Sequence, residues 1–177
     1  HEKYGLVESD FLSAELTMVP AGSARDVGFD RSMVGAYGQD DKVCAYTSLR
    51  AALDVKAPAV TSVTVFADKE EVGSDGNTGL NSDFLKIFME DLCAAQGAES
   101  RRTLTNSTCM SADVNAAFDP TFPEVAEKRN TAYLNHGVVI TKYTGARGKG
   151  GTNDASAEFM YQVRDLLDRG GVIWQTG

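Results

Sequence analysis

Extended and helical apolar patterns alternate along this chain, and that alternation limits the possible folds more than any other feature. Residues 63–67 form a continuous apolar run, which is typical of a parallel strand buried on both faces. On either side, in residues 41–53 and 84–92, apolar residues recur instead at helical spacing. We therefore predict an α/β fold, a three-layer αβα sandwich around a mainly parallel sheet.

Further segments complete the predicted order of elements. Asn81 or Ser82 can cap the helix over 84–92, and residues 153–171 form a capped helix that Gly170 closes. The glycine-rich residues 21–39 and 145–153 are predicted to be irregular connections. Short strands are expected at residues 10–20, 107–113 and 137–143, and another begins at Gly171 and stops at the chain end, which leaves the sheet incomplete.

Composition indicates which cellular compartment and which classes of binding partner suit the chain. With 177 residues, 42% of them hydrophobic, the chain suits one compact domain. A net charge of −8 argues against nucleic acid or an anionic membrane as partner, because phosphate contacts need clustered Lys and Arg. No apolar run reaches the ~18 residues that a membrane span needs. The cysteines, Cys44, Cys93 and Cys109, are widely spaced among apolar neighbours, which predicts buried, reduced thiols in a cytoplasmic protein.

Acidic residues stand at three places beside predicted elements. Asp40 and Asp41 come just before the helix over 41–53, where a simple N-cap would also explain them. Glu70 and Glu71 follow the apolar run at 63–67, and Asp113 ends the predicted strand over 107–113. Each of these could also be an ordinary solvated turn.

Taken together, the three acidic positions favour a metal site. Functional groups in open α/β sheets gather beyond the carboxyl ends of the strands, so we expect these carboxylates at one rim of the sheet. Like charges at one rim repel each other unless a cation neutralises them. Carboxylates with histidine partners suit a pair of divalent metals, with one carboxylate bridging both and a separate glutamate acting as general base.

Other catalytic motifs fit less well. The chain has no G-x-S-x-G segment, and its histidines are His1 and His136 alone. His136 lies in a loop before a predicted strand and is not expected to bind a metal. Residues 75–86 begin like a calcium loop, but Leu80 stands where the turn glycine belongs and Lys86 where the bidentate glutamate belongs.

Four blocks of the sequence resemble the aspartyl-aminopeptidase family of two-zinc exopeptidases, particularly its bacterial members. The ordered blocks extend over nearly the whole chain and are far more specific than any lone acidic pair. They are "VPAGSARDVGFDRSMVGAYGQDDKVCAYTSLRA", "VFADKEEVGSDG", "CMSADVNAAFDP" and "YLNHGVVITKYTGARGKGGTNDASAEF".

This resemblance implies a role for each matching residue. Asp40 would bridge both metals, while Glu71 would bind one zinc and Asp113 the other. Glu70 would be the general base, and Lys142 would lie near the first side chain of the substrate. In the wider clan the peptide bond after the bridging aspartate is often cis, so a cis bond is expected after Asp40.

The resemblance also predicts that the chain is the central part of a longer enzyme. In the family two histidines complete the metal site, one in a His-x-Asp segment well before this region and one near the C-terminus. His1 does not fit that pattern, and His136 falls in the wrong block. Residues 1–30 would be the end of an inserted dimerisation domain and its return into the catalytic domain. Residues 31–177 would be the central part of the catalytic metallopeptidase domain.

From these features we expect the full-length protein to be a cytoplasmic zinc aminopeptidase with two zinc ions per subunit. It would form a homo-oligomer and release N-terminal amino acids from peptides by metal-activated water attack. This chain alone is expected to hold zinc partially or not at all, to be inactive, and to self-associate through exposed apolar edges. Two alternatives stay open: a non-catalytic assembly module that keeps only the fold, and a deacylase on the same scaffold.

Overall fold

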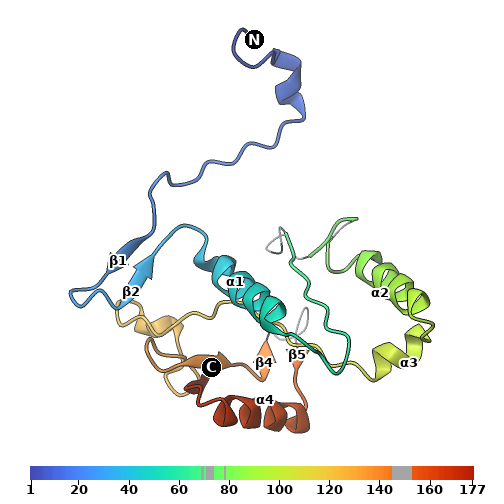
Figure 1. The fold of residues 1–177 in the computed structure, drawn as a ribbon. Helices are drawn as coiled ribbons and strands as arrows, with labels where there is room; N and C mark the ends of the chain where they lie inside the picture. Colours follow the sequence, from blue (N-terminus) through green and yellow to red (C-terminus); the bar gives the residue numbers. More distant parts are fainter. Residues whose placement is uncertain (69, 71–73, 78, 145–152) are drawn as a thin grey trace. The chain divides into compact units, whose positions relative to one another are not determined.

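The computed structural model describes residues 1–68, 70, 74–77, 79–144 and 153–177 (Figure 1). It divides into two units, His1–Ala112 and Asp113–Gly177. Among the described residues, three of the four α-helices belong to the first unit, and two of the three strand pairs belong to the second. In chain order the elements are η1 (Glu8–Leu12), β1 (Arg25–Val27), β2 (Met33–Gly35), α1 (Gln39–Asp54), α2 (Phe84–Ala95), α3 (Ser100–Thr105), η3 (Pro123–Val125), β3 (Val138–Ile140), β4 (Tyr143–Thr144), β5 (Asn153–Asp154), α4 (Ala157–Arg169) and β6 (Trp174–Thr176).

A β-hairpin precedes α1 in the first unit, within the segment predicted to be an irregular connection. β1 and β2 pair antiparallel, with Val27 opposite Met33. Gly28 begins the turn at a φ of 92°, a conformation that costs a glycine little because it has no Cβ. The turn therefore lets a glycine-rich stretch fold back on itself, which the sequence analysis did not predict.

Three predicted strands are absent from the described residues. Residues 8–12 form the 3-10 helix η1, and residues 13–20, 61–67 and 107–113 carry no backbone ladder. Val65 and Phe66 are 48% and 53% exposed, so the apolar run at 63–67 is not buried on both faces. An extended apolar run becomes a strand only where a neighbouring strand bonds its backbone groups, and none does so here.

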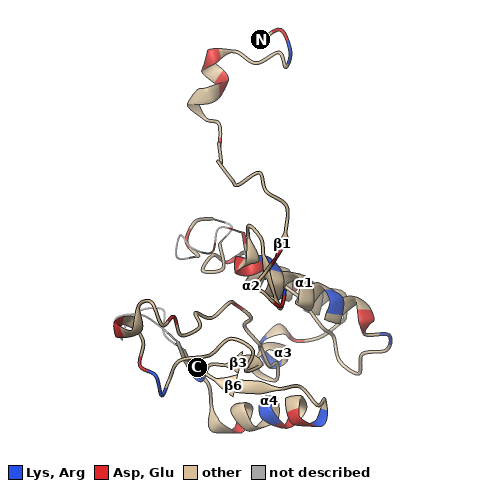
Figure 2. Cartoon of the chain, turned by 90° about the vertical axis from the view of Figure 1, so that its left-hand side faces the viewer, with Lys and Arg blue, Asp and Glu red and all other residues tan. Residues whose placement is uncertain are grey.

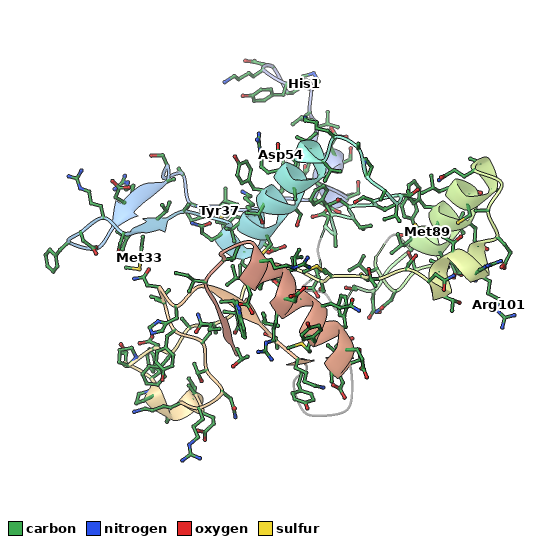
Figure 3. All side chains as sticks on the ribbon, turned by 60° about the horizontal axis from the view of Figure 1, so that its bottom comes forward. His1, Met33, Tyr37, Asp54, Met89 and Arg101 are labelled. Carbon is green, nitrogen blue, oxygen red and sulfur yellow. The ribbon has the colours of Figure 1, made fainter. Side chains whose placement is uncertain are left out.

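The helices of the first unit agree better with the sequence. α1 confirms the helix predicted from about Asp41 to Leu53; in Figure 3 Tyr37 is labelled just before the start of this helix and Asp54 at its end. α2 confirms the helix over 84–92. Its N-cap residue is Asp83 rather than Asn81 or Ser82, but the Ser82 hydroxyl accepts a hydrogen bond from the Phe84 N–H at 3.3 Å.

The three cysteines differ in their surroundings. Cys93 on α2 is buried at 4% exposure, and Cys44 on α1 is half-buried. Cys109 is exposed, so the prediction of a buried thiol is wrong there, because the segment around it forms no strand and joins no core. All three lie in described parts of the chain, and none forms a disulfide.

In the second unit β3 and β6 pair in parallel, with Val138 opposite Trp174. At Gly137, before β3, a Cβ would lie 2.2 Å from the carbonyl oxygen of Ile173, so only glycine allows the two segments this close. Ile140 on β3 is buried at 8% exposure. The helix α4 lies between the two strands in sequence, as in the crossover unit of an α/β fold, so the predicted α/β class is confirmed.

The predicted helix over 153–171 is confirmed as α4. The Ser156 hydroxyl caps it by accepting a hydrogen bond from the Phe159 N–H at 3.2 Å, and Gly170 is its C-cap residue. Asp168 on α4 accepts a hydrogen bond from the Trp174 indole at 2.8 Å, which ties the helix to β6. Acidic and basic residues are interspersed along α4 (Figure 2). No helix in the described ranges is long and apolar enough to cross a membrane.

Candidate metal and substrate site

The paired acids Asp40 and Asp41 lie at the start of α1. Gly38 is the N-cap residue, with a left-handed φ of 77°, and Lys42 begins the helical hydrogen bonds by donating its N–H to the Gly38 carbonyl at 3.1 Å. Gln39 donates its side-chain amide to the Val34 carbonyl at 3.0 Å, which ties the start of α1 to β2. The backbone therefore holds this acidic pair between the hairpin and the helix.

The peptide bond between Asp40 and Asp41 is cis, which confirms the expectation drawn from the resemblance. Neither residue has helical backbone angles, although both stand within the helical segment: Asp40 has φ −87° and ψ 111°, and Asp41 has φ −114° and ψ 28°. The chain thus leaves helical geometry at the two acids and resumes it after them.

The Asp41 carboxylate provides a test of whether this position suits a metal. Its Oδ1 atom is buried and has no hydrogen-bond partner among the described residues. A buried carboxylate oxygen without a donor is costly, and a cation is one way of offsetting that cost. Zinc binds Asp and Glu oxygens directly, so the Asp40–Asp41 pair fits the carboxylate part of a zinc site.

The next acidic pair lies only partly within the described residues. Glu70 is exposed, and its carbonyl accepts a hydrogen bond from the Ser74 N–H at 3.1 Å. Glu71, for which the resemblance implies a role as zinc ligand, lies outside the described residues.

Asp113 is the first residue of the second unit and is exposed. Its Oδ1 accepts a hydrogen bond from the Val114 N–H at 2.7 Å. Among the described residues this is the one hydrogen bond of the Asp113 carboxylate. Asp40 and Glu70 thus belong to the first unit, Asp113 and Lys142 belong to the second, and the metal-ligand roles stay predictions.

Lys142 lies just before β4 and has close partners. Its ammonium Nζ is 2.5 Å from Oδ1 of Asp154 on β5, and it stands 4.3 Å from the centre of the Tyr143 ring. The hydrogen bond to Asp154 is the main cause that raises the pKa of Lys142 above its ordinary value, against a smaller opposing effect of desolvation. Lys142 is therefore a charged residue whose position is set by two neighbours.

Sequence reasoning missed Asp154 and Tyr143 as partners of Lys142. The segment "NDAS" was interpreted only as the start of a helix, and 12 positions separate Lys142 from Asp154. The contact depends on the pairing of β4 with β5, and no periodic pattern in the sequence signals such a short pair.

His136 makes contacts of a structural kind. Its Nδ1 lies 2.8 Å from the Leu134 carbonyl oxygen, and its ring packs against Tyr133 at a centre-to-centre distance of 5.6 Å. Tyr133 in turn packs against Phe118 at 5.5 Å. His136 thus takes part in the packing of its own loop, and the expectation that it binds no metal stays a prediction.

Comparisons with known proteins identify a family and several curated proteins that are similar to this chain. The sequence pattern of the family described as "Aminopeptidase I zinc metalloprotease (M18)" matches residues 1–176. Two proteins named "Probable M18 family aminopeptidase 1" are similar over 180 residues, at 52% identity in Clostridium acetobutylicum and 48% in Thermotoga maritima. Both matches take in 99% of this chain, but 39% and 40% of those proteins. The chain therefore spans about two fifths of the length of these curated relatives.

Solved structures agree with this result. Aminopeptidase I from Clostridium acetobutylicum superposes with a TM-score of 0.90 at 53% identity, over 99% of this chain and 38% of that one. The Thermotoga maritima M18 aminopeptidase gives a TM-score of 0.82 at 48% identity, over 90% and 36%. A yeast aminopeptidase described as a dodecamer shares the fold at 24% identity and a TM-score of 0.69, over 86% and 36%. The chain belongs to the M18 family of zinc metalloproteases.

Proposed function

We propose that the complete protein is a zinc-dependent aminopeptidase that releases N-terminal amino acids from peptides. Family membership supports this, because the matching family is one of zinc metalloproteases and the similar curated proteins are named aminopeptidases. The observation in the structure that carries it is the acidic pair at the start of α1, with a buried Asp41 oxygen that lacks a hydrogen-bond partner in the described ranges.

In this proposal Asp40, Glu71 and Asp113 would hold two zinc ions, and the family resemblance gives Asp40 the role of the shared ligand. Further ligands, histidines by the family resemblance, come from parts of the protein beyond this chain. Zinc, when bound, polarises the carbonyl of the first peptide bond and makes water a nucleophile at neutral pH. This chain would contribute carboxylates that fix the metal positions.

Glu70 is proposed as the general base. Its carboxylate takes a proton from the attacking water and passes it to the leaving nitrogen, so one residue acts in both halves of the reaction. Glu70 is exposed in the described structure, which is the accessibility that proton exchange with a bound substrate requires. Lys142 is proposed to lie beside the first side chain of the substrate.

The assembly and the location of the protein are part of the same proposal. Many large apolar side chains are exposed in this chain, including Leu12, Met18 and Phe29 at 89%, 100% and 114%. Surfaces of this kind favour association with other protein surfaces. We therefore propose a cytoplasmic homo-oligomer, in which residues 1–30 return from a dimerisation domain and residues 31–177 are the central part of the catalytic domain.

Metal analysis and hydrolysis assays of the complete protein test this function. We expect bound zinc, together with cleavage of aminoacyl anilides that carry a free amine and no cleavage of their N-acylated counterparts. A protein that holds no zinc and cleaves neither substrate would instead be a non-catalytic assembly module. Preference for the N-acylated substrates would identify a deacylase.

A further inference from the structure

Lys42 directly follows the acidic pair at the start of α1, but its side chain runs back over the residues before that pair. Its N–H donates to the Gly38 carbonyl at 3.1 Å, in the first turn of the helix. A Cβ added at Gly38 would lie 2.9 Å from both Cε and Nζ of Lys42, so the lysine stem crosses directly over this glycine. The ammonium then lies over the Tyr37 ring, 5.0 Å from its centre.

This arrangement leaves neighbouring opposite charges unpaired. Among the described residues Lys42 forms no ion pair, although Asp40 and Asp41 are the two residues before it. The buried Oδ1 of Asp41 likewise has no hydrogen-bond donor in the described ranges. A lysine has a flexible four-carbon stem and three rotatable donors, so an unrestrained Lys42 would be expected to supply that donor. The ring contact is therefore what the structure offers to keep the ammonium elsewhere.

We propose that Tyr37 is a positioning residue of the metal site, whose ring holds the Lys42 ammonium away from the acidic pair so that these carboxylates stay open to zinc. This inference rests on the proposed function, which gives the acidic pair its metal. The face of an aromatic ring attracts a cation without carrying a net negative charge. The Tyr37 ring can thus retain the lysine without adding another carboxylate that would itself compete for zinc.

The size of the effect follows from the exposure of the two partners. Tyr37 is 51% exposed, and cation–π contacts at exposed sites are weak. Lys42 is exposed as well, and ion pairs in contact with water are of similar strength. Removal of the ring should therefore move the ammonium toward the carboxylates, where it competes with zinc. We expect the zinc affinity to fall about two- to fivefold.

Zinc binding by the complete protein tests this inference, with zinc alone as the probe and a chromophoric chelator of known affinity as the competitor. Tyr37→Leu should raise the apparent zinc dissociation constant about two- to fivefold, because the ammonium is released. Tyr37→Phe keeps the ring face and should retain the wild-type constant. Tyr4→Leu is the matched control, since it removes a ring whose centre lies 5.1 Å from the Lys3 ammonium, and it should leave zinc binding unchanged.

A second background separates a positioning role from a merely structural one. Lys42→Gln has no ammonium and should bind zinc at least as tightly as the wild-type protein. In that background Tyr37→Leu should have no further effect on the zinc dissociation constant. A ring that matters only for packing would instead weaken zinc binding to the same extent with and without the lysine, which would overturn the inference.

The outcomes also separate this inference from the proposed function. A complete protein that binds no zinc and cleaves no aminoacyl anilide would contradict both. If the wild-type protein binds zinc but Tyr37→Leu binds it equally well, only the inference is overturned. If Tyr37→Leu fails to fold, pentafluorophenylalanine at position 37 decides, because it keeps the shape of the ring but not its electron-rich face. It should weaken zinc binding about two- to fivefold, and an unchanged dissociation constant would overturn the inference.

Discussion

Two carboxylates of this chain, Asp41 and Asp154, differ in whether the chain itself supplies a partner for their negative charge. Asp154 is exposed and has its own cation, the Lys142 ammonium 2.5 Å away. Asp41 has a buried oxygen without a hydrogen-bond donor in the part of the chain that the structure describes. Asp154 therefore has its counter-ion within the chain, whereas the Asp41 carboxylate is suited to a bound cation that the chain does not supply. The first is paired with a lysine of the chain, and the second stands next to Asp40, a proposed zinc ligand.

The largest effect is expected at Glu70, the acid that we propose moves a proton rather than holding a charge. Glu70→Gln in the complete protein should lower kcat by about 10²–10⁴-fold, because the amide cannot accept the proton from water. Zinc content should stay close to that of the wild-type protein. Steady-state kinetics combined with metal analysis checks both statements. Retained turnover would remove Glu70 from the mechanism.

A smaller effect should follow from disturbing the backbone that places the acidic pair. Gly38→Ala forces a side chain into a φ of 77° and should lower the free energy of unfolding by about 1–2 kcal/mol. Gly22→Ala is the control, because Gly22 has no left-handed φ and no atom within 4 Å of an added Cβ. Urea denaturation of the two variants should separate them. Equal stabilities would show that the Gly38 conformation does not matter.

The smallest effect concerns the Lys142–Asp154 pair and appears at high pH. Because folding raises the pKa of Lys142 above its ordinary value of 10.5, the pair contributes stability that is fully present below pH 10.5. That contribution is lost as the pH rises through the raised pKa. The difference in Tm between the wild-type protein and Asp154→Asn should therefore shrink above pH 10.5.

Asp165→Asn serves as the control for this titration. Asp165 pairs with Arg169 at 2.8 Å, and arginine stays charged throughout the range. Its Tm difference should stay constant as the pH rises. If the Tm difference for Asp154→Asn is equally constant, Lys142 draws no stability from the pair.

Local patterns in the sequence predicted the helices well. α1, α2 and α4 each carry apolar residues at helical spacing, and a helix bonds its own backbone, so the segment contains most of the information. The cis bond after Asp40 was expected only through the family resemblance. Charge and composition alone would not have indicated it.

The strands and the lysine pair were harder to predict. A strand needs a partner elsewhere in the chain, so the extended runs at residues 10–20, 63–67 and 107–113 did not become strands among the described residues. The β1–β2 hairpin was not predicted, because its two short strands have no clear pattern of their own and are defined only by their pairing with each other. The contact of Lys142 with Asp154 depends on the pairing of β4 with β5. Sequence spacing alone carries no signal for it.

Zinc content of the complete protein tests most directly whether the acidic pair at the start of α1 holds metal. Asp40→Asn and Asp154→Asn each remove one negative charge, but only the first removes a proposed metal ligand. We predict about two zinc ions per subunit in the wild-type protein and in Asp154→Asn, and clearly fewer in Asp40→Asn. Equal zinc content in the wild-type protein and Asp40→Asn would contradict the account, because the acidic pair at the start of α1 would then hold no metal.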